Sequence, residues 1–410
     1  MPWNATRRSR TPGSRTHERV FEGVRIRDRD PGTGTDRRTP RPRGHRPGRG
    51  DRPLRAGDRA PRRGATLARH GERPRRGAHR LLHGRAGSDA AGGCGSAGRG
   101  VGGPDGGRTV TVALHELRAA IDDELEGWLS ETLRGAGPIA DPIRYAVLAK
   151  GKRIRPLLFV GAWEAAGAAA GQGAGNGAGA LHRVALGPEL VHTYSLIHDD
   201  LPCMDDDDLR RGRPTVHVRY GERAAVMTGA ALLPLAIRAV AEGAAGLKLP
   251  DPVAGRLIGV LTAAAGGDGM VGGQLLDLLA EKQHVGFETL ERIHLGKTAR
   301  LIAACCTMGG VAARASDETV GRLTRFGIAI GLAFQTVDDI LDVTGSSTRM
   351  GKVGGRDEAL GKATTPSVLG LEGARARAEE FGREALGEIS PLPGADRLRE
   401  IGRLVLDRDR

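Results

Sequence analysis

The chain has 410 residues, with 62 Lys and Arg against 49 Asp and Glu, so its formal net charge is +13. Aromatic residues make up only 3% of it, which argues against base-stacking recognition of nucleic acid. The sequence has no apolar segment typical of a secretion signal and none long enough to predict a membrane span.

Residues 1–110 differ in composition from the rest. They are dense in Arg, Gly and Pro and lack periodic apolar positions, so they cannot bury enough surface to offset the entropy of ordering. We predict a disordered, basic, low-complexity segment. A nucleic-acid-binding tail is disfavoured by the shortage of aromatic residues, and a targeting peptide by length and acidic content. We favour an over-extended reading frame, with translation starting near Val110 or Val112.

Residues 111–410 have the composition of one folded helical domain. Ala, Leu, Arg and Glu dominate, alternation of β-branched residues is scarce, and Gly or Pro interrupts the segments near 135–138, 250–252 and 391–393. The pattern predicts an all-α fold built as a single large helical unit, of a size that can bury a substantial core.

The first chemical motif is the cationic loop GKRIRP at residues 151–156. Arg suits fork-like recognition of phosphate oxygens, and Lys supplies a mobile point charge. Taken singly, such residues are more often surface decoration than ligands. Five more basic residues follow: Arg210 and Arg211 come directly after a first acidic cluster, and Lys297, Lys352 and Lys362 lie near or between the later segments. Together they form an inventory suited to a diphosphate.

The first acidic cluster is HDDLPCMDDDD at residues 198–208, after an apolar segment with helical spacing. Asp199 and Asp205 are too far apart for one helical turn and out of phase on a regular helix. We therefore predict that the chain leaves the helix through Pro202, which brings the two carboxylates together.

The second acidic cluster is QTVDDILD at residues 335–342, where Asp338 and Asp342 lie one helical turn apart on the same face. Crowded carboxylates repel by about 1 kcal/mol per pair at 4 Å in water and about 4 kcal/mol near a protein surface. A single run would be more typical of a solvated acidic face. Two clusters without a Cys or His framework favour bound Mg²⁺ or Mn²⁺ over zinc.

Histidine and cysteine carry little signal of their own. His192 and His198, on the apolar lead-in to the first cluster, would by themselves be structural. The four cysteines show neither zinc spacing nor a disulfide framework, and the adjacent Cys305 and Cys306 fit a helix core. A reducing, cytoplasmic location is expected.

From about Leu114 to Leu406 the chain resembles trans-polyprenyl diphosphate synthases. The type is the short-chain bacterial farnesyl diphosphate synthase, close to geranylgeranyl diphosphate synthases. The motifs that carry the resemblance are, in order, GKRIRP, HTYSLIHDDLPCMDDDDLRRGRPTVH, GGQLLDL, HLGKTARLI, FQTVDDILDVTG and MGKVGGRDEALGKATTP. The aspartate blocks and the RRG after the first are highly specific, whereas GGQ and KT are weak alone.

The resemblance implies an isoprenoid synthase fold, a helical bundle around a deep central cavity, usually as a homodimer. It also implies condensation of isopentenyl diphosphate with dimethylallyl or geranyl diphosphate to give farnesyl diphosphate. The alternative is a geranylgeranyl diphosphate synthase. A terpene cyclase is disfavoured because the second cluster is a full DDxxD and GKRIRP supplies an isopentenyl diphosphate site. A non-catalytic nucleic-acid-binding protein would require lost motif residues, and none is lost.

The same resemblance implies roles for individual residues. Three Mg²⁺ ions per site, with Mn²⁺ as an alternative, would be held by Asp199, Asp200, Asp205, Asp338, Asp339 and Asp342, the last two through metal-bound water. The catalytic set would be Asp199, Asp205, Asp338, Lys297 and Arg210, with Arg210 on the allylic diphosphate. Isopentenyl diphosphate would meet Lys152, Arg155, His192 and Arg211. The allylic side would be lined by Lys297, Thr298, Gln335, Lys352 and Lys362. Product length would depend on Tyr194 and Ser195.

Overall fold

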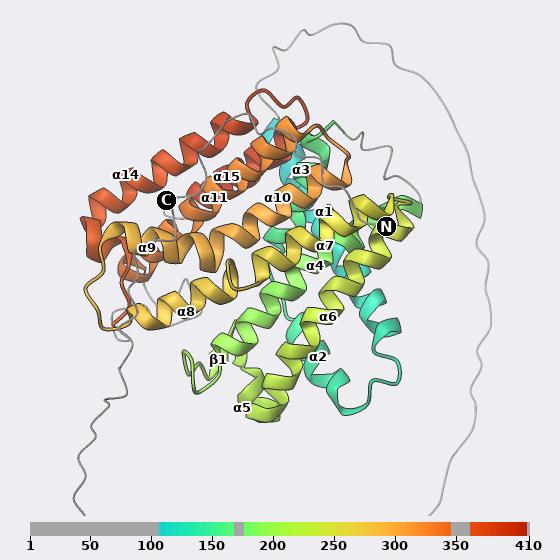
Figure 1. Ribbon diagram of the computed structural model, residues 1–410, viewed down its shortest axis with the longest axis horizontal. Helices are drawn as coiled ribbons and strands as arrows, with labels where there is room; N and C mark the ends of the chain where they lie inside the picture. Colours follow the sequence, from blue (N-terminus) through green and yellow to red (C-terminus); the bar gives the residue numbers. More distant parts are fainter. Residues whose placement is uncertain (1–105, 168–175, 346–360, 408–410) are drawn as a thin grey trace, which may run out of the picture. The chain divides into compact units, whose positions relative to one another are not determined.

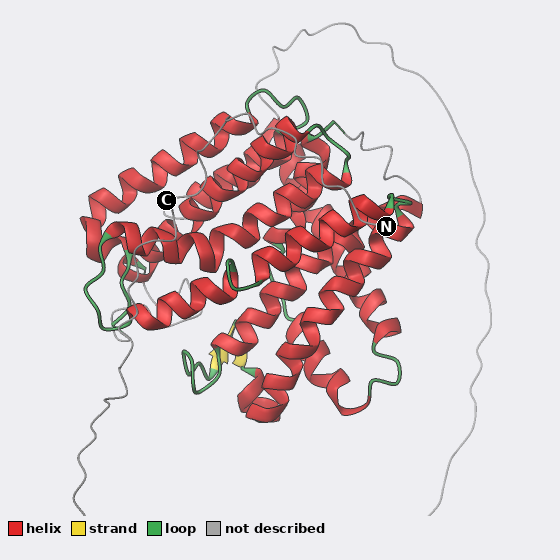
Figure 2. Ribbon diagram, in the orientation of Figure 1, coloured by secondary structure: helices red, strands yellow, loops and turns green. Residues whose placement is uncertain are grey.

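The computed structural model describes residues 106–167, 176–345 and 361–407, with the side chains of 106–113 and 176 left aside. These residues belong to one compact unit, Gly95–Arg410. Most of them are helical, and the strands among the described residues form one short hairpin (Figures 1 and 2). The predicted all-α fold is confirmed. The predicted disorder of the N-terminal segment and the role given to Lys352 lie outside the described residues.

The first part of the bundle is built from α1, α2 and α3. The bounds are α1 Gly106–Thr132, a 3₁₀ turn Gly137–Ile139, α2 Ala140–Val147 and α3 Ile154–Ala165. In α1, Ile121, Leu125 and Trp128 recur at helical spacing and are buried, as their periodicity predicts. The Trp128 indole donates to Glu242 Oε2 at 2.7 Å, so this helix is fixed by a polar contact as well as by packing.

The centre of the bundle is the pair α4 and α6. The bounds are α4 Asn176–Asp199, β1 Leu209–Arg210, β2 Arg213–Pro214, α5 Val216–Tyr220 and α6 Glu222–Gly246. The two long helices lie side by side (Figure 1). They approach closely because Gly187 on α4 faces Val240 on α6, where a Cβ would overlap the valine side chain. The antiparallel β1–β2 hairpin was not predicted from the sequence.

The next elements bring the KT and GGQ motifs together. The bounds are α7 Asp251–Ala265, α8 Met270–Ala280, α9 Phe287–His294, a π-helical turn Leu295–Ala299 and α10 Arg300–Ala312. A Cβ at Gly273 on α8 would overlap the main chain of Lys297, so only glycine permits this contact. The π-helical turn widens the helix where Lys297 and Thr298 lie, and such turns are frequent at functional sites.

The remaining helices carry the second aspartate motif. The bounds are α11 Asp317–Thr344, α14 Thr365–Ile389 and α15 Asp396–Leu406. Ser316 caps α11 by accepting from the Thr319 amide, and Thr364 and Ser367 form a capping box at the start of α14. Figure 1 shows α11, α14 and α15 together at one side of the bundle, where the three pack on one another. One large apolar core joins most of the helices, and a smaller cluster lies between α11 and α14.

Helices α8 and α6 each carry several large apolar residues that the described part of the chain leaves exposed. On α8, Val271, Leu275 and Leu279 recur every four residues, with 44%, 56% and 58% of their surfaces exposed. On α6, Val226 and Met227 are exposed as well. By length and composition alone α6 could cross a membrane. Its other face packs on α4 and α7, which accounts for much of its apolar character.

Candidate active site

The first aspartate motif lies where α4 ends. The helix stops at Asp199, and the chain turns back so that the Asp205 amide donates to the Asp199 carbonyl at 2.9 Å. The Asp207 amide likewise donates to the Asp200 carbonyl at 3.1 Å. The predicted break in the helix is therefore confirmed. It brings Asp205 beside Asp199, although the two residues are six positions apart in the sequence.

The second aspartate motif lies within the last turns of α11, where successive residues face different surroundings. Asp338 lines a cavity that Asp199 also lines. Asp339 is 3% exposed, and its Oδ2 accepts from both the amide and the hydroxyl of Thr365, each at 2.8 Å. Its Oδ1 accepts from Gln335 at 3.1 Å. Asp339 thus holds the start of α14, whereas Asp338 faces the cavity.

The cavity between the two motifs has a volume of about 600 Å³. Its walls come from α3, α4 and the loop after it, α6, α8, the π-helical turn and α11, and they combine charged ends with apolar side chains such as Phe334 and Leu278. Residues that the sequence singled out and that line it are Arg155, His192, Tyr194, Ser195, Asp199, Lys297, Thr298, Gln335 and Asp338. This shape suits a molecule with a charged head and an apolar body.

A second cavity of about 500 Å³ adjoins the first and is lined mainly by polar and cationic groups. Lys152 and Arg155 line it from the GKRIRP loop, and Arg211 lines it from the hairpin. Arg155, His192 and Phe334 line both cavities, so the two share a wall. Four residues expected to meet isopentenyl diphosphate are therefore brought together, from segments up to about sixty positions apart.

Two lysines lie among the carboxylates. Lys297 Nζ is 2.6 Å from Asp277 Oδ2, and Lys362 Nζ is 2.7 Å from Asp205 Oδ1. Burial opposes the charge of Lys297, but Asp277 and Asp199 outweigh it and raise the pKa of this lysine. Both lysines thus place an ammonium group among the carboxylates near the first aspartate motif.

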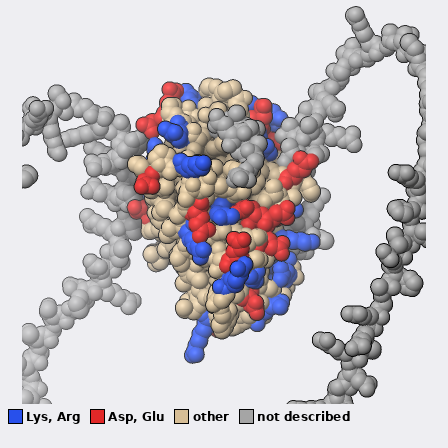
Figure 3. Space-filling view, turned by 90° about the vertical axis from the view of Figure 1, so that its right-hand side faces the viewer, with Lys and Arg blue, Asp and Glu red and all other residues tan. Residues whose placement is uncertain are grey.

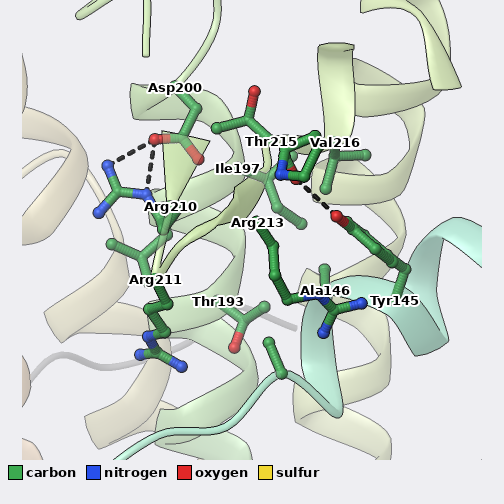
Figure 4. Close-up of a pocket in the computed structure, with 13 residues that line it drawn as sticks. Tyr145, Ala146, Thr193, Ile197, Asp200, Arg210, Arg211, Arg213, Thr215 and Val216 are labelled. Atoms are coloured by element: carbon green, nitrogen blue, oxygen red, sulfur yellow. Dashed lines mark hydrogen bonds and ion pairs between the residues drawn. The ribbon is translucent and has the colours of Figure 1, made fainter. Parts of the chain in front are cut away.

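Arg210 lies behind the motif and not on the wall of the large cavity. Its Nε donates to Asp200 Oδ1 at 2.6 Å (Figure 4). Its Nη2 donates to Asp207 Oδ2 at 3.1 Å. Asp200 and Asp207 are both buried. The arginine thus neutralises two carboxylates of the acidic run, which lowers the repulsion between them.

Burial shifts the pKa values of two groups on the cavity wall, Asp199 and His192. It raises the pKa of Asp199 to about 6, with repulsion from Asp205 adding to the effect and Lys297 opposing it. Burial and the positive charges of Arg155 and Arg211 lower the pKa of His192 well below its ordinary value. His192 is therefore a neutral imidazole at pH 7.

The carboxylates of the cavity fit Mg²⁺ by chemistry, since they offer hard oxygen ligands. Within the described ranges, no three His, Cys, Asp or Glu residues gather closely enough to hold an ion by themselves. Mg²⁺ usually keeps several waters and is bound through one or two carboxylates together with substrate phosphates. Asp199 and Asp205 on one side, with Asp338 on the other, fit that pattern better than an all-protein cage. Figure 3 shows one face of the molecule, on which acidic and basic side chains are interspersed.

Sequence reasoning missed several residues of the site. Asp277 binds Lys297, and Gln274 lines the large cavity, both from the GGQLLDL motif that was judged weak alone. Within GKRIRP, the sequence alone did not distinguish the role of Arg153 from those of Lys152 and Arg155. It is 4% exposed and pairs with Glu189 at 2.9 Å and Asp122 at 2.7 Å, so it fastens the loop. Only its ion-pair partners in the folded structure, Glu189 and Asp122, reveal this structural role.

The raised pKa of Asp199 leads to a prediction about stability. Because its folded-state pKa of about 6 exceeds the ordinary 3.8, ionisation destabilises the fold; the cost is absent below pH 3.8 and complete above about pH 6. In EDTA, Asp199→Asn should therefore melt a few degrees above the wild type at pH 7 and at the same temperature below pH 4. Differential scanning fluorimetry across pH measures this. Asp208→Asn, at an exposed position of the same run, is the control, and a lower melting temperature for Asp199→Asn at pH 7 would contradict the argument.

Fold and site together define an all-α protein in which two aspartate motifs and a set of cations surround two adjoining cavities. The polyprenyl synthetase profile matches residues 137–391, more than half of the chain. The chain therefore belongs to the polyprenyl synthetase family, whose members use isoprenyl diphosphate substrates.

Relatives and solved structures agree on this family. The chain is 42% identical over 270 residues to "Heterodimeric geranylgeranyl pyrophosphate synthase large subunit 1, chloroplastic" of Arabidopsis thaliana, covering 64% of this chain and 71% of that protein. It is similar to an FPP/GFPP synthase structure from Zymomonas mobilis, with a TM-score of 0.62, 36% identity and coverage of 72% and 99%. A Helicobacter pylori geranyltransferase complexed with magnesium and isoprenyl diphosphate has a TM-score of 0.59, 37% identity and coverage of 66% and 88%.

Proposed function

We propose that this protein is a farnesyl diphosphate synthase that joins isopentenyl diphosphate to dimethylallyl and then geranyl diphosphate. The observation that carries the proposal is the pair of adjoining cavities with Arg155, His192 and Phe334 in both walls. One cavity, with carboxylates and apolar walls, suits an allylic diphosphate with its tail. The other, lined by Lys152, Arg155 and Arg211, suits a second diphosphate.

In the proposed reaction, the allylic carbon–oxygen bond breaks and its electron pair leaves with the diphosphate. The double bond of isopentenyl diphosphate attacks the allylic cation, and a proton then passes from the adduct to the departing diphosphate. Mg²⁺ bound at Asp199, Asp205 and Asp338 would neutralise charge on the leaving group. Lys297 and Lys362, which lie beside carboxylates of the site, would bind the same diphosphate oxygens.

The remaining groups would orient the reactants. Thr298 Oγ1 donates to Gln335 Oε1 at 2.8 Å, and Gln335 in turn donates to Asp339, which fixes both side chains on the cavity wall. Their oxygens are suited to stabilise the allylic cation. His192, neutral because burial and the neighbouring cations lower its pKa, would donate a hydrogen bond without competing for the proton. Apolar wall residues would exclude water, which would otherwise quench the cation.

The C15 product rests on Tyr194. This residue lies five positions before Asp199 on α4 and lines the large cavity. Its ring meets the His198 ring edge-on, with centroids 4.8 Å apart. A ring at this position would form the floor for a growing tail. The second candidate is a C20 product, which the names of the plant relatives favour.

The proposal is tested by incubating the purified full chain with labelled isopentenyl diphosphate, dimethylallyl diphosphate and Mg²⁺. The dephosphorylated products are then separated by chromatography. Farnesol as the main product supports the proposal, and geranylgeraniol supports the second candidate. No labelled chain longer than the starting material would reject both.

For assembly, we propose a homodimer that covers the exposed apolar residues of α8 and α6. Val271 and Leu275 on α8 are exposed and also line the large cavity, so a covering copy would shield substrate from water. A relative named as heterodimeric keeps assembly with a different chain as the alternative. Light scattering of the purified chain, with Leu275→Lys for comparison, decides between monomer and dimer. We further propose a cytoplasmic location, without nucleic-acid partners.

The N-terminal segment is proposed to lie outside the catalytic domain. A chain shortened to begin at Gly106, the first residue of α1, should keep its turnover and its melting temperature within a few degrees. The physical reason is that residues 1–105 offer no periodic apolar face to the core. Paired assays and melting curves of the two chains test this. Loss of most activity on shortening would make the segment part of the enzyme.

A further inference from the structure

The cationic cavity is assembled from two chain segments that are far apart in sequence. Residues 150–155, which run from the loop after α2 into the first turn of α3, supply Lys152 and Arg155. The β1–β2 hairpin supplies Arg211. A diphosphate can bind both segments well only if their separation is fixed in advance. The contacts between the segments therefore decide how well this cavity binds its anion.

The hairpin is too small to hold its own shape. Each strand has two residues, with Leu209 paired to Pro214 and Arg210 to Arg213. Such a short ribbon is marginal in water without further packing. Arg211 and Gly212 form the turn with φ angles of +53° and +74°, and a non-glycine residue at positive φ is strained. Contacts from elsewhere must hold Arg211 in this conformation.

Tyr145 on α2 supplies such a contact. Its hydroxyl donates to the Pro214 carbonyl at 2.7 Å, at the end of the hairpin. Its ring is approached by the guanidinium groups of Arg213 and Arg219, at 4.2 and 4.5 Å from the centroid. Figure 4 shows Tyr145 reaching one side of the hairpin, while Arg211 points away from it.

A second contact joins the same two segments. Arg211 Nη1 donates to the Lys150 carbonyl at 2.9 Å, three residues beyond the end of α2. The guanidinium reaches this carbonyl because residue 151 is glycine, where a Cβ would lie 2.7 Å from Arg211 Nη1. Tyr145 and Lys150 therefore hold the hairpin from one stretch of chain, and that stretch leads directly into Lys152 and Arg155.

We propose that Tyr145 is a positioning residue. Through its bond to Pro214 it fixes the hairpin, and so sets the distance from Arg211 to the cations of the 150–155 segment. It thereby governs affinity for the diphosphate in the cationic cavity. The proposal rests on the proposed function for the identity of that diphosphate, isopentenyl diphosphate. The geometry alone requires only that the cavity bind a diphosphate.

The test begins with Tyr145→Phe, which removes the hydroxyl and keeps the ring that both arginines approach. The expected result is about a fivefold rise in KM for isopentenyl diphosphate, from loss of one hydrogen bond, with kcat and the KM for the allylic substrate within about twofold. Tyr220→Phe is the matched control, because its ring lies 5.5 Å from that of Tyr145. It should leave all three constants unchanged. An unchanged KM in Tyr145→Phe would overturn the proposal.

A double-mutant cycle with Arg211→Ala tests the route of the effect. If Tyr145 acts through Arg211, adding Tyr145→Phe to Arg211→Ala should change the KM by less than about twofold. The full fivefold rise in that background would show that Tyr145 acts in another way. Equal melting temperatures for wild type and Tyr145→Phe would separate a positioning role from general loss of structure.

Binding of inorganic pyrophosphate, measured by calorimetry without Mg²⁺, separates this proposal from the proposed function. Tyr145→Phe should weaken pyrophosphate binding about as much as it raises KM, and Tyr220→Phe should not. If the wild type elongates no prenyl chain, the proposed function fails, and the calorimetric comparison still tests Tyr145. If turnover is normal and pyrophosphate binds the wild type and Tyr145→Phe equally, the role of Tyr145 is rejected and the proposed function still stands.

Discussion

Asp199→Asn is expected to reduce kcat by about two orders of magnitude or more, with the helical fold intact. Asp199 closes α4 and lines the large cavity, and its backbone accepts the bond that brings Asp205 to its side. The substitution keeps the size of the side chain but removes the negative charge that an Mg²⁺ ligand needs. Steady-state assays at saturating substrates measure the loss, and circular dichroism checks the fold.

The control for this prediction comes from the same acidic run. Asp208 is exposed, so Asp208→Asn should retain activity within about twofold. Asp338→Asn, on the facing helix, should resemble Asp199→Asn, since both carboxylates line one cavity. Excess EDTA should abolish wild-type turnover, and Mg²⁺ should restore it. Turnover near the wild-type value in Asp199→Asn or Asp338→Asn, or in excess EDTA, would contradict the proposal that the metal is held from two sides.

Tyr194→Ala is expected to move the main product from C15 to C20 or longer. Tyr194 lines the large cavity from α4, one and a half turns before Asp199, so its ring can block a tail that grows away from the carboxylates. Truncation to alanine would deepen the cavity by roughly the size of the ring. Chromatography of dephosphorylated products, with geranyl or farnesyl diphosphate as the allylic substrate, measures the change.

Tyr194→Phe is the matched variant, because it keeps the ring and loses only the hydroxyl. Its product should stay at C15, which assigns the effect to ring volume. Ser195 lines the cavity beside Tyr194, but its hydroxyl donates to the His192 carbonyl at 2.9 Å. Ser195→Ala should therefore alter product length less than Tyr194→Ala. Geranylgeraniol as the main wild-type product, or no change in Tyr194→Ala, would remove Tyr194 as the limit on chain length.

Much of the fold follows from local sequence. Ile121 and Leu125 have helical spacing and are both buried on α1, and the spacing of Asp338 and Asp342 predicted their place in one helix. The break after Asp199 followed from Pro202 and from the phase of the two aspartates. These predictions succeeded because helical periodicity and the effect of proline depend on residues only a few positions apart, so their physical cause is visible in the local sequence.

The division of labour among like residues was decided only by tertiary structure. Asp338 and Asp339 are neighbours in sequence, yet one faces the cavity and the other accepts from Thr365, because only one side of α11 meets the start of α14. Arg153 and Arg155 differ for the same reason. Arg153 forms ion pairs with Glu189 and Asp122, while Arg155 lines both cavities.

Sequence by itself determined that this chain is helical, carries paired aspartate motifs and has cations suited to a diphosphate. Tertiary structure decided which of those charges meet, since several of the partners come from distant segments. Lys362 reaches Asp205 across 157 positions, and Tyr145 reaches Pro214 across 69. The β1–β2 hairpin and the π-helical turn also escaped prediction. Both are short and lack a period of their own, so packing against neighbouring segments fixes their shape.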